Sequence, residues 1–123
     1  MFGLFGDKTQ RQARRLNKDA PVIIEHARQT FRGDTIRDIA LRTTEHLERA
    51  HKVFEANAVG LKRAIMEYQR LHREARDHRD DVSLSAFTLV LIYIRAEALG
   101  EAGRPAVNAI DDFIAGWEHA QED

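Results

Sequence analysis

The chain has 123 residues, a formal net charge of −1 and no cysteine, and 43% of its residues are hydrophobic. This length and composition predict a single ordered domain over residues 1–123, and the near-neutral charge argues against a protein that binds nucleic acid by neutralising phosphates. The lack of cysteine excludes disulfides and thiol chemistry and is typical of a cytoplasmic protein.

Residues 1–18 are predicted to form a basic N-terminal arm or short helix. Its first apolar residues are Phe2, Leu4 and Phe5, and they are followed by basic residues at Lys8, Arg11, Arg14 and Arg15. Aromatic residues beside a basic stretch can lie on an anionic membrane surface, so residues 2–15 offer a membrane-surface role as one alternative. The favoured interpretation is that this segment docks on the protein itself or on a second copy. The acidic C-terminal stretch further suggests that the basic and acidic ends are neighbours within the bundle or across the dimer.

Apolar residues recur at intervals of three and four along the whole chain, which predicts helices and leaves no place for strands. The first full helix is expected over residues 20–32. Asp19 can cap this helix, Pro21 is tolerated in a first turn, and Gly33 provides a stop.

The next stretch predicts one long central helix over residues 35–78. Alternating steps of four and three define a coiled-coil-like seam in which only Thr43 and Asn57 are polar. The seam keeps its phase across Gly60, which favours one continuous helix, although a glycine marks the place where the helix could bend or divide. The seam positions are Ile36, Ala40, Thr43, Leu47, Ala50, Phe54, Asn57, Leu61, Ala64, Tyr68, Leu71 and Ala75.

Two more helices complete the predicted fold. Residues 84–99 are apolar almost all round, which indicates a helix surrounded by protein. Gly100 and Gly103 bracket a turn, and Pro105 begins a last helix over residues 105–119. We therefore expect an all-α fold, an antiparallel bundle of four or five helices with one long central helix.

A rod over residues 35–78 would extend about 66 Å at 1.5 Å per residue, much further than its neighbours. Either two of the shorter helices cover its opposite halves, or a second copy of the chain covers it. Because a long apolar stripe exposed to water is costly, we expect a homodimer. The expected interface residues are Phe2, Leu4, Phe5, Leu47, Phe54, Leu61 and Tyr68.

Glu48, His51 and Glu55 share one face of the predicted long helix and form a potential half of a metal site. Carboxylate-bridged metal bundles need a Glu-x-x-His pair from each of two helices, and this chain has one such pair. His46 lies about 140° from His51 round the helix, so the two cannot bind one ion. A solvated, salt-bridged flank is the favoured interpretation, and we expect no cofactor.

Motifs for catalysis are missing from the sequence. It has no glycine-rich phosphate loop and no nucleophile elbow, and the residues after His51 do not match a phosphotransfer site. The sequence therefore favours a non-catalytic helical module that binds another protein as an adaptor or regulator. The alternatives are metal binding through Glu48, His51 and Glu55 and a membrane-surface role through residues 2–15.

Overall fold

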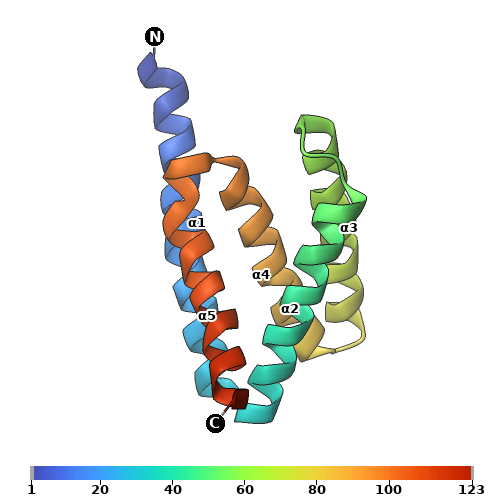
Figure 1. The fold of residues 1–123 in the computed structure, drawn as a ribbon. Coiled ribbons are helices and arrows are strands. Elements are labelled where there is room, and N and C mark those ends of the chain that lie inside the picture. The colour runs from blue at the N-terminus through green and yellow to red at the C-terminus, as the bar shows by residue number, and fades with distance from the viewer. Residues whose placement is uncertain (1, 123) are drawn as a thin grey trace.

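A computed structural model describes the backbone of residues 2–122 and the side chains of residues 8–117. The described backbone forms five α-helices and no strand, so the predicted all-α bundle is confirmed (Figure 1). The helices are α1 (Phe2–Thr30), α2 (Gly33–Val53), α3 (Ala58–Asp77), α4 (Asp81–Ala98) and α5 (Arg104–Glu122), and a short 3-10 helix, η1 (Gly100–Gly103), precedes the last.

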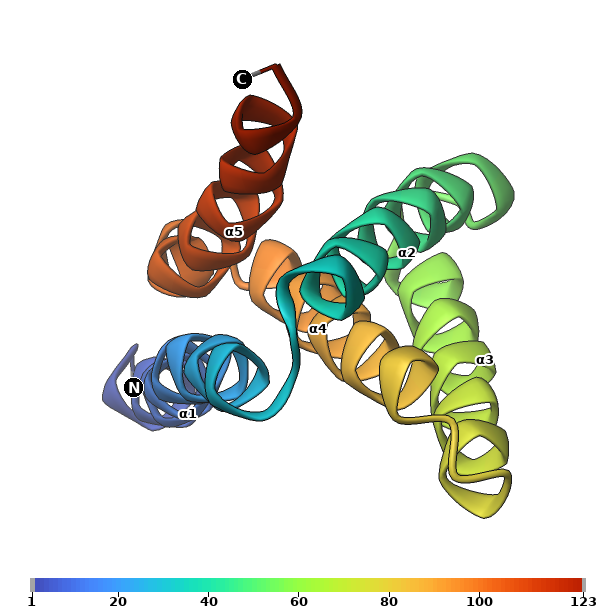
Figure 2. The same cartoon turned by 90° about the horizontal axis from the view of Figure 1, so that it is seen from below.

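The helices alternate in direction along the chain, so that α1, α3 and α5 run one way and α2 and α4 run the other (Figure 1). Viewed from the end of the bundle, α4 lies in the middle, with α1 and α5 on one side and α2 and α3 on the other (Figure 2). The prediction that this apolar helix is surrounded by protein is confirmed, since α4 packs against all four other α-helices.

The predicted single helix over residues 35–78 is wrong. Its two halves are α2 and α3, which form a helical hairpin because residues 54–57 reverse the chain. Asn57 caps α3 by accepting a hydrogen bond from the backbone N–H of Gly60 at 2.8 Å. A β-carbon at Gly60 would overlap the carbonyl oxygen of Glu55, so this turn requires glycine.

The physical reason for the hairpin is the length of α4. With 18 residues, α4 is about 27 Å long and could cover less than half of a 44-residue rod. Folding back lets α2 and α3, with 21 and 20 residues, each pack along α4. Most of the apolar seam is thereby buried or half-buried within one chain, so the argument for a homodimer from an uncovered stripe no longer holds.

The predicted break between residues 18 and 20 is also wrong, because α1 continues through Pro21. Proline removes one helical hydrogen bond. The helix nevertheless continues, because its buried stripe runs past Pro21 in both directions, with a buried alanine at every seventh position, Ala13, Ala20 and Ala27. The Asn17 side chain ties this helix to the turn before α5 by donating to the Ala102 carbonyl at 3.0 Å and accepting from the Ala106 N–H at 2.9 Å.

The first and last described residues do not meet. Phe2 and Glu122 lie at opposite ends of the bundle, because α1 and α5 are parallel neighbours (Figure 1). The predicted proximity of the basic and acidic ends therefore does not extend to the terminal residues, although α1 packs against η1 and α5, where Asn17 bonds Ala102 and Ala106.

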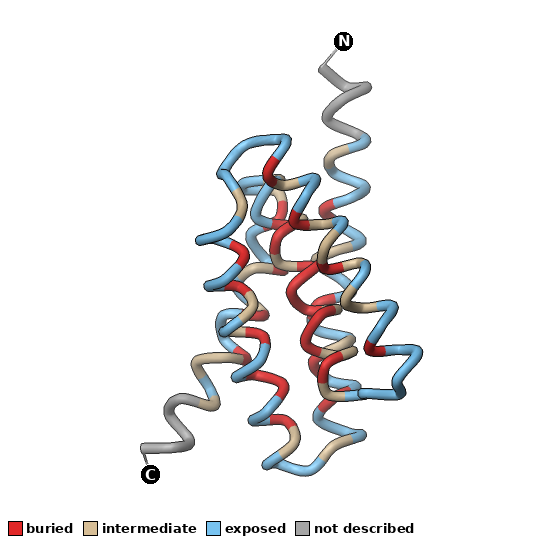
Figure 3. Tube along the Cα trace, turned by 90° about the vertical axis from the view of Figure 1, so that its right-hand side faces the viewer, coloured by how far each residue is buried: buried red, intermediate tan, exposed pale blue. Residues whose placement is uncertain are grey.

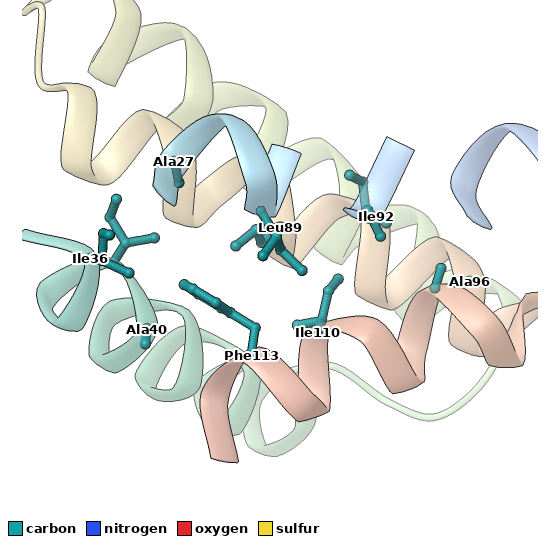
Figure 4. Packing of buried hydrophobic residues seen from close by; sticks show 12 residues of the cluster. Ala27, Ile36, Ala40, Leu89, Ile92, Ala96, Ile110 and Phe113 are labelled. Atoms are coloured by element: carbon teal, nitrogen blue, oxygen red, sulfur yellow. The ribbon is translucent and has the colours of Figure 1, made fainter. Parts of the chain in front are cut away.

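The core has two parts that share α4, and buried residues line the inner faces of the helices (Figure 3). The first part joins α1, α2, α4 and α5, where Ile36, Leu89, Ile110 and Phe113 point toward one another (Figure 4). The second part joins α2, α3 and α4. Its largest buried members are Leu47, Tyr68, Phe87, Val90, Leu91 and Ile94.

The predicted interface residues have different places in this core. Leu47 and Tyr68 are only 7% and 2% exposed, so they pack inside the chain rather than face a partner. Phe54 and Leu61 are half-buried at the edge of the second part of the core. The side chains of Phe2, Leu4 and Phe5 lie outside the described residues. None of the described helices has both the length and the apolar character that a bilayer-crossing helix needs.

Candidate functional site

An open apolar groove of about 610 Å³ lies between the α2–α3 turn and the end of α4, and we call it the hairpin groove. It forms because α4 ends at Ala98 and the chain then turns at Gly100, the first residue of η1, which has a positive φ of 62°. Only the last residues of α4 therefore line the groove, and α4 does not continue across the hairpin turn. The groove is lined by Ala50, His51, Phe54, Glu55, Ala56, Asn57, Ala58, Gly60, Leu61, Ala64, Ile94, Glu97 and Ala98.

The groove is apolar and has room between its large side chains. Phe54, Leu61 and Ile94 supply the large apolar surface, one from each of the three elements that meet there. Most other lining residues are alanine or glycine, which keep the space open. Val53 and Val59 flank the turn and are 62% and 60% exposed, so they extend the apolar surface around the turn.

The ionisable residues that line the groove are His51, Glu55 and Glu97, and no lysine or arginine lines it. His51 Nε2 lies 2.9 Å from Glu97 Oε1, so this pair bridges α2 and α4. Both side chains are about half exposed, and such surface pairs contribute little to stability. The Glu55 carboxylate accepts a hydrogen bond of 2.9 Å from the Asn57 amide. The rim is therefore acidic.

The face predicted for metal binding does not form. Because α2 ends at Val53, Glu55 lies in the turn rather than on the same helix as Glu48 and His51. Its carboxylate is bound by Asn57, and His51 is bound by Glu97. Among the described side chains, no group of three or more histidines and carboxylates is arranged to hold a metal ion.

His46 connects the two helices of the hairpin. The Tyr68 hydroxyl donates its one proton to the His46 carbonyl at 3.0 Å, so the imidazole Nδ1, 3.2 Å from the same hydroxyl, must act as a donor. The imidazole also packs edge-on against Phe87, with ring centroids 4.9 Å apart. Burial lowers the pKa of His46 below its ordinary value, and the positive charge of nearby Arg49 lowers it further. The neutral ring is therefore favoured.

His72 forms a similar contact between α3 and α4. Its Nε2 lies 3.1 Å from the Thr88 hydroxyl, which donates its own proton to the Leu84 carbonyl at 2.7 Å. The imidazole therefore donates to Thr88. Burial lowers the pKa of His72, and the positive charge of nearby Arg76 lowers it further. Both half-buried histidines thus join neighbouring helices, and their lowered pKa favours the neutral ring.

This arrangement predicts that acid weakens the fold. Each of these two histidines binds a proton more readily in the unfolded chain, whose pKa is about 6.5, than in the folded one. The stability that the two neutral histidines contribute is therefore fully present above pH ~6.5. This contribution is lost as the pH falls from there toward the lowered pKa values of the folded chain. The urea midpoint should drop between pH 7.5 and pH 5. A His46→Gln/His72→Gln variant should show a smaller drop, and an equal drop in both proteins would contradict this origin.

Tyr93 joins α4 to α5. Burial, with a hydrogen bond and the negative charge of Asp111, raises the pKa of Tyr93 to about 12. Its hydroxyl is thus protonated near neutral pH and donates a hydrogen bond to the Asp111 carboxylate, which joins the two helices.

Sequence reasoning missed the hairpin groove because the groove exists only when residues 54–57 turn. The available signal was Asn57, a favourable helix cap, three residues before Gly60.

Compared with known protein families, curated proteins and solved structures, the chain gives no significant match. The geometry of the groove is therefore what supports a function.

Proposed function

We propose that this chain is a non-catalytic helical interaction module that binds an apolar helical segment of protein in the hairpin groove. The observation that carries the proposal is an open groove with Phe54, Leu61 and Ile94 at its surface and no lysine or arginine in its lining. An amphipathic helix that lays its apolar face in a groove is a common mode of protein recognition.

The size and charge of the groove support this kind of ligand. A volume of about 610 Å³ accommodates a few large side chains from one face of a helix, such as residues spaced by three or four positions. The exposed carboxylates of Glu55 and Glu97 favour a helix with basic residues beside its apolar face. We further propose that the protein acts in the cytoplasm as a homodimer; the cysteine-free composition is compatible with that compartment.

The test places a photo-crosslinking amino acid at position 58, which lines the groove, in the full chain expressed in its native cell. We expect one discrete crosslinked protein. The matched control places the same amino acid at position 66, where Met66 is 60% exposed and lies about 140° from Leu61 round α3.

A second variant tests whether the groove itself carries the binding. Ala98→Trp adds bulk at the exposed edge of the groove without removing a core contact and should reduce crosslinking about tenfold, a loss of about 1.4 kcal/mol. Met66→Trp should leave crosslinking unchanged. Equal crosslinking from positions 58 and 66, or none from position 58, would contradict the proposed function.

A further inference from the structure

We infer that the segment bound in the hairpin groove is the start of α1 from a second copy of this chain. This inference rests on the proposed function of the groove and names its occupant. It also restores a reason for a homodimer, one that does not depend on a long exposed rod.

The apolar pattern of α1 continues in the sequence toward the N-terminus. Within the bundle, Ala13 is buried and Leu16 is half-buried against the first part of the core. Steps of four and three carry the same helical register from Ala13 back through Thr9 to Phe5 and Phe2. The sequence thus places two phenylalanines, three positions apart, where a groove-binding helix needs its apolar residues.

The charges of the two surfaces are complementary. The residues that follow the phenylalanines include four exposed cations, Lys8, Arg11, Arg14 and Arg15. The groove carries Glu55 and Glu97, and its described lining includes His51 but no lysine or arginine. Opposite charges around an apolar contact favour this pairing and fix its orientation.

The position of the two surfaces requires a second copy. The start of α1 and the α2–α3 turn lie at the same end of the bundle (Figure 1). Within one chain α1 and α3 stand on opposite sides of α4, and α1 is a continuous helix, so it cannot reach its own groove (Figure 2). A two-fold axis at that end allows each copy to insert α1 into the groove of the other, which closes the assembly at a dimer.

The natural lack of cysteine makes a direct test available. Full-length Thr9→Cys protein, which keeps both phenylalanines and has its cysteine in the same helical register, is mixed with Ala58→Cys protein under mild oxidation, and we expect a disulfide-linked heterodimer. The matched control mixes Thr9→Cys with Met66→Cys, which should give at least tenfold less heterodimer. Equal yields from the two mixtures, or no heterodimer from the first at a concentration of several hundred micromolar, would overturn the inference.

Sedimentation gives a measurement without crosslinks. The wild-type chain should dimerise, and Phe2→Gln/Phe5→Gln and Ala98→Trp should each raise the dimer Kd at least tenfold, whereas Met66→Trp should not. Circular dichroism verifies that each variant is folded. A wild-type monomer at every concentration, together with Phe2- and Phe5-dependent flotation on vesicles containing anionic lipid, would overturn the inference and assign the segment to a membrane surface.

Failure of this inference can be distinguished from failure of the proposed function. If position 58 crosslinks to a different protein in the cell while the purified chain stays monomeric, the groove binds protein but the occupant is not α1. If position 58 crosslinks to nothing and the chain is monomeric, both proposals fall.

Discussion

Gly60→Ala is expected to destabilise the chain by about 3 kcal/mol, near the upper end of overpacking effects. The added β-carbon would overlap the backbone of Glu55, and a backbone group in a tight turn cannot move aside as a flexible side chain can. Relief requires the hairpin turn to open, which separates Phe54 and Leu61 at the edge of the core. Thermal unfolding should show the loss as a decrease in Tm on the order of 10 °C.

Gly116→Ala is the matched control, because Gly116 lies inside α5 and a β-carbon there meets nothing within 4 Å. In a helix interior the same substitution should stabilise by about 0.5–1 kcal/mol. Gly103→Ala should also destabilise the chain, since its β-carbon would overlap the Ala96 carbonyl oxygen. If Gly60→Ala and Gly116→Ala shift Tm by the same amount, the close approach at Gly60 does not constrain the turn.

The same turn explains the main error of the sequence prediction. A seam at steps of three and four predicts a helix but does not distinguish a rod from a hairpin, because in either case the apolar face meets another helix. The local signal at Asn57 contributes only about 1 kcal/mol as a cap, too little to decide the chain path by itself. What decides it is the 18-residue length of α4, since a helix of that length covers the seam only when the seam is folded in two.

Pro21 led to the opposite error, a break where the helix continues. Proline in the first turn of a helix is common, so Asp19 followed by Pro21 indicated a new helix. The structure keeps one helix because Ala20, Ile24 and Ala27, which lie around Pro21, bury one continuous face in the first part of the core. Tertiary packing outweighed the local preference.

The later helices were predictable because their local signals agree with their packing. The run from Leu84 to Leu99 has no polar face, and its buried position within α4 follows from that composition alone. Pro105 is the second residue of α5, where a missing N–H costs little. The groove could not be predicted in the same way, because it depends on where α4 ends relative to a turn that the sequence pattern concealed.

Phe113→Ala is expected to destabilise the chain by about 3–5 kcal/mol, the usual cost of removing a buried phenylalanine. Phe113 is 1% exposed and lies on α5 within the first part of the core, among Ile36, Leu89 and Ile110 (Figure 4). Because α4 contributes adjacent buried residues to both parts, Leu89 to the first and Val90 to the second, loosening one part should loosen the other.

Hydrogen exchange tests this coupling, with Phe113→Leu as the conservative control that should cost under about 1.5 kcal/mol. In Phe113→Ala, amide protection should fall in α3 as well as in α1 and α5, although α3 belongs to the second part of the core. Protection that falls only in α1 and α5 would mean that the hairpin and α4 unfold as a separate unit. The groove, which lies within that unit, would then form independently of the rest of the bundle.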